Sequence, residues 1–190
     1  FTALFQRASQ VKAAPKADRL RLADLFDKRA ALPAALSFLV NCAFGAIITF
    51  IALHGAERGV ENISPYFIVY AAATLVSRPI TGKVIDRRGF FAPGLASALG
   101  VVITLALIAV SDNIFMFCLA GLFAGVGIGT GMGTLQTMAV AAAPPERRGV
   151  ATSTFFFGFD AGIGAGAAVA GAMANAIGYG PMYLVMTVFP

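Results

Sequence analysis

Long apolar runs alternate with short polar segments along the chain. A helix that crosses a bilayer needs about 20 mostly apolar residues, and five segments reach that length. They are residues 32–54, 64–82, 91–111, 113–143 and 150–177. A further apolar run begins near Met182 and reaches Pro190, which is too short to cross a bilayer. We therefore expect five membrane spans and the start of a truncated sixth.

These runs predict helices rather than the strands of a membrane barrel. Barrel strands alternate polar and apolar residues over about 10 positions, whereas residues 101–108 are apolar at all positions except Thr104. A helix also satisfies its backbone hydrogen bonds within one segment, as the bilayer interior requires. The expected fold class is an all-α membrane protein.

The composition supports a membrane protein over a soluble one. The chain has 190 residues, of which 58% are hydrophobic and 12% are charged, against roughly 25% charged in soluble domains. The net charge of +5 does not indicate a nucleic-acid partner, because the basic residues gather between the apolar runs. Cys42 and Cys118 lie inside apolar runs with no second ligand nearby, so we expect no metal site and no cofactor.

The charges between the runs predict an orientation. Thirteen of the fourteen Lys and Arg residues fall toward one side of the membrane, and by the positive-inside rule that side is the cytoplasm. Residues 1–31 are then a cytoplasmic segment and residues 32–190 a membrane bundle. Within the first part, residues 16–30 are compatible with either a helix on the membrane surface or a partly ordered linker.

Two motifs occur in order along the chain. Residues 82–89 (GKVIDRRG), preceded by Arg78-Pro79, resemble the Gly-x-x-x-Asp-Arg-x-Gly loop of the major facilitator superfamily, in the form that follows its eighth helix. Residues 144–151 (PPERRGVA) resemble the loop between its tenth and eleventh helices, and residues 155–164 are similar to the eleventh helix of bacterial drug and metabolite exporters. The chain departs from the family in having Phe90-Phe91 where basic residues are common, and alanine at 167 and 168 where a proline is common.

The resemblance implies the C-terminal half of a twelve-helix transporter: helices seven to eleven and the start of the twelfth. It implies a location in the cell inner membrane, with the N-terminal half of the same protein as partner. The implied activity is secondary transport of a small molecule by alternating access, as proton-coupled efflux or antiport. A receptor or structural protein with the same fold remains the alternative. An intramembrane protease is disfavoured, because the spans offer one acid and the chain one histidine.

Asp160 is the principal candidate for the site, because it is the one acid in the interior of a predicted span. An ionisable group there costs several kcal/mol unless it faces water or a partner. It either takes up a proton or binds a cationic group, with a purely structural role as the alternative. Phe157 and Phe159 lie within one turn of Asp160 and suit an apolar or aromatic cation.

Further candidates follow from the family, which lines its cavity from the seventh, eighth, tenth and eleventh helices. Asn41 and Gln136 are polar residues in such spans, and each is a candidate for the substrate cavity or for a bond to a neighbouring helix. The resemblance also implies a gating loop and a second loop before the eleventh helix. These contain Gly82, Asp86, Arg87, Arg88 and Gly89 with Arg78, and Arg147, Arg148 and Gly149.

Overall fold

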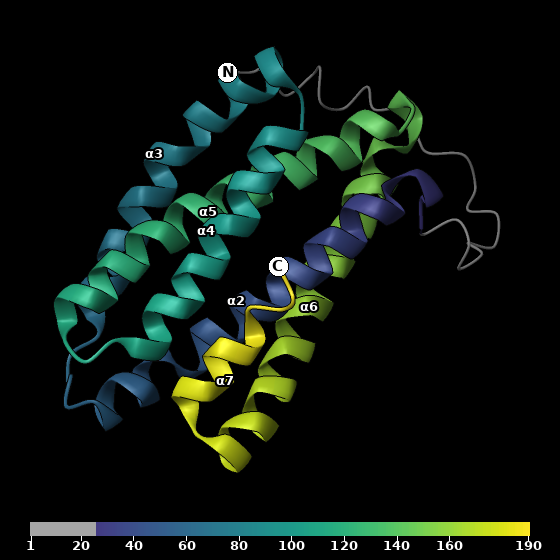
Figure 1. Ribbon diagram of the computed structural model, residues 1–190. Coiled ribbons are helices and arrows are strands. Elements are labelled where there is room, and N and C mark those ends of the chain that lie inside the picture. The colour runs from purple at the N-terminus through teal and green to yellow at the C-terminus, as the bar shows by residue number, and fades with distance from the viewer. Residues whose placement is uncertain (1–25) are drawn as a thin grey trace, which may run out of the picture.

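The computed structural model describes residues 26–190, and every regular element in that part of the chain is helical (Figure 1). The elements in chain order are η2 (Lys28–Ala30), α2 (Ala31–Glu57), α3 (Ser64–Arg88), α4 (Phe91–Val110), α5 (Ile114–Ala142), η3 (Pro145–Arg147), α6 (Arg148–Ile177) and α7 (Tyr179–Met186). The all-α prediction is confirmed, and a long helix stands at each of the five predicted spans.

Four of the described stretches are long and apolar enough to cross a membrane: Lys28–Glu57, Phe91–Val110, Ile114–Ala142 and Pro145–Ile177. Residues 64–82 were also predicted to be a membrane span, but the helix at this position, α3, is not among the four. Arg78 and several hydroxyl residues lower the hydropathy of α3. Since α3 packs extensively against the apolar α5, it is a polar member of a membrane bundle.

The predicted loop at residues 83–88 is wrong. Helix α3 continues through Gly82, Asp86, Arg87 and Arg88 and ends at Gly89, whose φ is 71°. The intervening Lys, Val and Ile residues do not break a helix, and the two arginines favour the negative end of the helix dipole. Glycine adopts a positive φ more readily than other residues, so the helix ends and the chain turns only at Gly89.

Two other boundaries also differ from the prediction. Arg148 and Gly149, expected in a loop, are the first two residues of α6, while Arg147 ends the short η3 turn. Helix α7 begins at Tyr179 rather than near Met182, because Gly178, with a φ of 81°, allows an immediate turn out of α6. The segment at residues 16–30, expected as either a surface helix or a partly ordered linker, lies outside the described residues except for its last five, of which Lys28–Ala30 form a 3-10 turn.

The long helices form a layer with a cover on one side. Helix α3 packs on α5, α5 on α2, and α2 on α6, which gives the order α3–α5–α2–α6. Helix α4 packs mainly on α5, and α7 packs on α4, α6 and α2. Figure 1 shows the result as two groups side by side, α3 with α4 and α5, and α2 with α6 and α7. Among the described helices, the side of the layer away from α4 and α7 is uncovered.

Glycines permit the close contact between α2 and α6. Gly158, Gly162 and Gly166 recur every fourth residue on α6 and face the backbone of α2. A Cβ on Gly166 would stand 2.5 Å from the carbonyl carbon and the Cα of Cys42. Small residues let helix backbones approach in this way in membranes. The stripe therefore packs α6 closely on α2.

The glycines of α5 serve two neighbours. They recur at every second residue from 125 to 133, and a spacing of two places successive residues about 200° apart on a helix. A Cβ on Gly125 would lie 2.5 Å from the Ala73 side chain on α3, whereas one on Gly127 would lie 2.9 Å from the Val101 nitrogen on α4. Helix α5 is therefore held closely between α3 and α4.

Candidate functional site

Asp160 lies in the middle of α6, on the side away from α2. It is twelve residues from the first residue of the helix, or about 18 Å along its axis. It is two positions from both Gly158 and Gly162, and so about 200° around the helix from the face that packs on α2. Its side chain is exposed and makes no hydrogen bond or ion pair within residues 26–190.

The exposure of Asp160 restricts what this face of α6 contacts in the membrane. Asp160 is a charged group in the middle of a 30-residue helix, and facing lipid there would cost several kcal/mol. Ser153 and Gly164 follow the same face at helical spacing and are also exposed. Phe157, three residues before Asp160, is exposed on this face too, so it is the charge of Asp160 that favours water or another protein surface over acyl chains.

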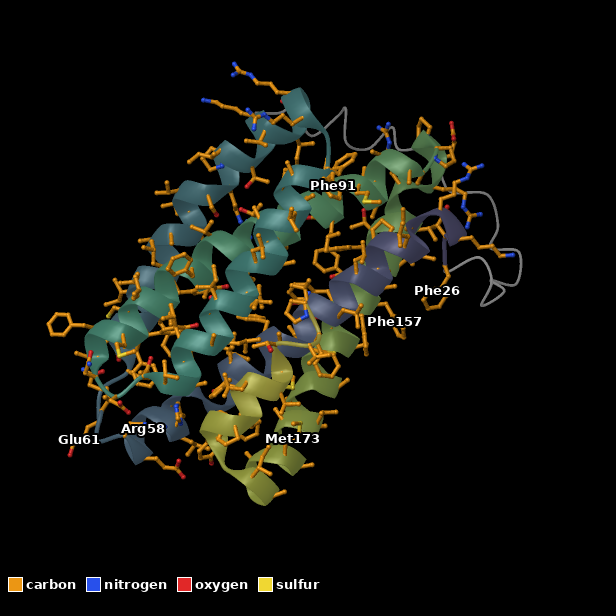
Figure 2. The ribbon with its side chains drawn as sticks, in the orientation of Figure 1. Phe26, Arg58, Glu61, Phe91, Phe157 and Met173 are labelled. Carbon is orange, nitrogen blue, oxygen red and sulfur yellow. The ribbon has the colours of Figure 1, made fainter. Side chains whose placement is uncertain are left out.

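The phenylalanines near Asp160 point in different directions. Phe155 is fully buried against Ala30, Leu135 and Ala139. The predicted Phe159 packs on Phe155 with their ring centroids 6.3 Å apart, as part of this core. The predicted Phe157 is 63% exposed. It meets the ring of Phe26 edge-on at 5.3 Å, at one end of the bundle (Figure 2).

Asn41 is buried at the contact between α2 and α6. Its Nδ2 donates to the carbonyl oxygen of Ser37 at 2.7 Å and to the Ser37 hydroxyl at 3.2 Å. A Cβ on Gly162 would stand 3.1 Å from the Cβ of Asn41. The Asn41 Oδ1 atom is buried and has no partner among the described residues. The structure thus places Asn41 inside the helix packing and away from Asp160.

Arg78 and Gln136, which the sequence singled out separately, line one pocket of about 170 Å³. The Arg78 Nη2 atom lies 3.5 Å from the Met132 sulfur across the contact between α3 and α5. Thr81, Gly82 and Ile85 of α3 also line the pocket. The pocket has a partly polar lining, and it overlaps the first residues of the Gly82–Gly89 motif.

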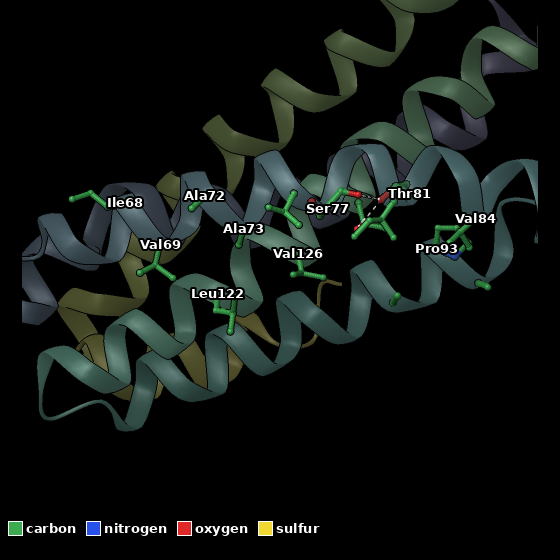
Figure 3. Close-up of a pocket in the computed structure, with 15 residues that line it drawn as sticks. Ile68, Val69, Ala72, Ala73, Ser77, Thr81, Val84, Pro93, Leu122 and Val126 are labelled. Atoms are coloured by element: carbon green, nitrogen blue, oxygen red, sulfur yellow. Dashed lines mark hydrogen bonds between the residues drawn. The ribbon is translucent and has the colours of Figure 1, made fainter.

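A larger pocket, also lined by α3, has a different character (Figure 3). It encloses about 640 Å³ between α3, α4 and α5, and apolar side chains such as Ile68, Val76 and Val126 line it. Ser77 and Thr81 lie at its floor with their hydroxyls bonded within the bundle. No charged residue lines it. Such a groove suits lipid chains better than a polar substrate, so its size does not make it the site.

The two pockets open on opposite flanks of α3. Val76, Ile80 and Val84 face the large apolar pocket, which α4 also lines, whereas Arg78, Gly82 and Ile85 line the small one. Within the helix these two sets lie on either side of Thr81, which contacts α5 through its hydroxyl oxygen, 3.1 Å from the Thr130 hydroxyl oxygen. Arg78 therefore faces away from α4, on the uncovered side of the layer.

A contact that the sequence did not reveal ties the start of α2 to the start of α6. Asp27 is buried and accepts a hydrogen bond from the Arg147 Nε at 2.9 Å. Its own amide donates to the Thr154 hydroxyl at 3.0 Å. The bond from the Arg29 amide, and then Arg147, hold the pKa of the Asp27 carboxyl below its usual value, although burial acts in the opposite direction. Arg147 thus pairs with a specific acid. From the sequence alone, it was one of several charged residues in the segment before the eleventh helix, with no partner indicated.

The opposite end of the bundle has its own buried polar contact. The His54 Nε2 atom lies 3.0 Å from the Ile108 carbonyl oxygen, and the ring is surrounded by Phe117, Tyr179 and Tyr183. Arg58 and Asp112 pair just outside it. Figure 2 shows Arg58 at the end of the molecule opposite Phe91. These contacts fix α2 to α4 where both helices end.

Comparison with known proteins gives the family. The family model described as "Major Facilitator Superfamily" matches residues 67–190. The "Multidrug resistance protein MdtG" of Dickeya zeae (strain Ech586) is 25% identical over 158 residues, covering 80% of this chain and 38% of that protein. Uncharacterized MFS-type transporters of Burkholderia mallei (strain SAVP1) and Burkholderia pseudomallei (strain 668) are 27% identical over 158 residues, covering 83% of this chain and 39% of each relative.

The chain thus spans about two fifths of the length of the curated relatives it matches. No solved structure matches it significantly. The family model covers well over half of the chain and includes both motifs from the sequence, Gly82–Gly89 and Pro144–Ala151. The apolar helices agree with a membrane transporter family. The chain therefore belongs to the major facilitator superfamily.

Proposed function

We propose that this chain forms the C-terminal half of a secondary transporter that exports a small molecule in exchange for protons. The observation that carries the proposal is Asp160: an acid in the middle of a long apolar helix, exposed on the face of α6 that is turned away from α2 and that no described helix covers. Family membership supports transport, and the printed name of one relative, a multidrug resistance protein, supports efflux.

The proposal assigns the uncovered side of the layer to a cavity between two halves. Helices α2 to α6 take the positions of helices seven to eleven, and α7 begins the twelfth. An N-terminal half packs opposite α3, α5, α2 and α6, and alternating access comes from rocking one half against the other. The tight glycine contacts within this half support its movement as one body. The basic end of the bundle, with residues 1–31, lies in the cytoplasm, and the membrane is the cell inner membrane.

In this proposal, Asp160 couples the export of the small molecule to the entry of protons. A carboxylate in a poorly solvated cavity is stabilised either by a proton or by a cationic group on a substrate. If the two compete for the same acid, a proton that binds from outside displaces the substrate to the outside, and release of that proton inside frees the acid for the next substrate. The aromatic rings of α6 suit a substrate with apolar surface. A receptor or structural protein with this fold has no need of such an exposed acid.

Reconstitution of the full-length transporter into liposomes tests the proposal. Ethidium, tetraphenylphosphonium and benzoate serve as an aromatic cation, an apolar cation and an aromatic anion. We expect a pH gradient to drive movement of at least one of these probes against its concentration gradient, and counterflow to persist when the gradient is collapsed. Liposomes that bind the probes without moving them would instead favour the receptor alternative.

A further inference from the structure

Arg78 has no anionic partner in the part of the chain that the structure describes. Its one polar contact there is the thioether of Met132, at 3.5 Å, and the two ion pairs among residues 26–190 involve Arg58 and Arg147 instead. A thioether is a weak acceptor, while a guanidinium carries five N–H donors. Most of the hydrogen-bonding capacity of Arg78 is therefore unused within this half.

The depth of Arg78 makes the missing anion significant. The residue lies five positions, or about 7.5 Å along the helix axis, before Lys83, where the charged end of α3 begins. It faces away from α4 and from the large apolar groove. A cation on the apolar part of a membrane helix is costly unless it pairs with an anion or reaches water.

Asp160 is too far away to be that anion. Arg78 is on α3 and Asp160 is on α6, and these helices are not among the packed pairs, whereas α5 packs against both. At 8–10 Å between neighbouring helix axes, α3 and α6 lie about 16–20 Å apart. The acid and the base therefore need separate partners on the uncovered side.

The pocket beside Arg78 has the features of a small anion site. Gln136 lines it from α5 with an amide that bonds to no described residue. The hydroxyls of Thr81 and Thr137 already donate to backbone carbonyls of their own helices, at 2.8 and 2.7 Å. Gly82 has no atom within 4 Å of where a Cβ would stand, so no side chain fills the space at that edge.

We propose that Arg78 and Gln136 bind a carboxylate or phosphate group of the transported molecule. The fork of a guanidinium matches such a group with two parallel hydrogen bonds, and the Gln136 amide supplies a further donor. The pocket of about 170 Å³ admits the acidic group, while the rest of the molecule lies toward the other half. The proposal rests on the proposed function, and it makes the substrate an anion or a zwitterion.

Thermal stabilisation of the full-length transporter in neutral detergent tests the site. The probes are inorganic phosphate, benzoate and its neutral counterpart benzamide, all at equal ionic strength. The variants are Arg78→Gln and Gln136→Glu, the second of which places a negative charge beside Arg78 at almost unchanged volume. Lys83→Gln is the matched control, since Lys83 is exposed on the same helix and does not line the pocket.

We expect phosphate and benzoate, but not benzamide, to raise the melting temperature of the wild type and of Lys83→Gln. Both pocket variants should bind the two anions at least about tenfold more weakly, the effect of losing a charged hydrogen bond. If Arg78→Gln does not fold, the loss of anion binding in Gln136→Glu still tests the site. Equal anion binding by the wild type and Gln136→Glu, or no binding by the wild type, would overturn the proposal.

Nanodiscs distinguish a lipid headgroup from a soluble anion. Stabilisation that depends on Arg78 and appears only with phosphatidylglycerol, and with neither soluble anion, would assign the site to lipid and overturn the proposal. The liposome transport assay is read independently. Anion binding without transport would contradict the proposed function alone, whereas transport that is unchanged in Arg78→Gln together with absent anion binding would contradict the anion site alone.

Discussion

Replacing Gly166 with alanine is expected to destabilise the full-length transporter, although alanine is the better helix former. The new Cβ would stand 2.5 Å from the carbonyl carbon and Cα of Cys42, and both atoms belong to the backbone of α2. A backbone cannot move aside as a flexible side chain does, so α6 must shift away from α2. Overpacking of this kind costs about 1–3 kcal/mol, and we expect a loss near the upper end.

Gly149→Ala provides the matched control for this prediction. Gly149 lies on the same helix, is exposed, and has no atom within 4 Å of where a Cβ would stand. Alanine there should be neutral or should stabilise by up to about 1 kcal/mol through its helix propensity. Thermal unfolding of the purified proteins measures both. Equal melting temperatures for Gly166→Ala and the wild type would show that α2 and α6 are not packed as described.

Asp160→Asn is expected to abolish transport driven by a pH gradient. Asparagine keeps the shape of the side chain but cannot carry the charge or exchange a proton. In liposomes, accumulation of the probe against its gradient should fall at least about tenfold, a difference of about 1.4 kcal/mol in driving force. If Asp160 carries only protons, counterflow persists in the variant. If it also binds a cationic group, counterflow of the two cationic probes is lost as well.

Two further variants complete this test. Asp160→Glu retains a carboxyl group and should keep part of the coupling. Glu146→Gln removes an exposed acid from the η3 turn, outside the long helices, and should transport as the wild type does. If Asp160→Asn accumulates the probe as the wild type does, with unchanged pH dependence, Asp160 has only a structural role and the coupling proposal is wrong.

The sequence predicted the helices well because membrane spans depend on local hydropathy. Each long apolar run became a helix, with ends mostly within a few residues of the prediction. The predicted end of α3 is wrong, because the charged residues at 83–88 were interpreted as a loop. Charged residues at a helix end are compatible with the helix continuing, and only Gly89 forces the turn.

The site was predictable only in part. Asp160 stands out in the sequence because an acid inside an apolar run is rare. The approach of Arg78 to Gln136 depends on how α3 packs against α5, which no local pattern encodes. The pairing of Asp27 with Arg147 joins residues 120 positions apart. Phe157 and Phe159 differ in exposure because the rotation of α6 against α2 is set by the glycine stripe.

The account depends most on the claim that the face of α6 carrying Asp160 borders water rather than lipid. Single cysteines in a cysteine-free full-length transporter test it, with Gly164→Cys one turn from Asp160 on that face and Val126→Cys in the apolar groove of α5. Both positions are exposed within this half, and Gly164 has open space for a side chain. Thiols react as thiolates, which form in water and not among lipid chains.

Labelling of native membranes with a membrane-impermeant maleimide is the decisive measurement. We predict rapid labelling at position 164 and none at position 126. Labelling at position 126, or equal resistance at both positions, would contradict the assignment of the uncovered side to an aqueous path through the transporter.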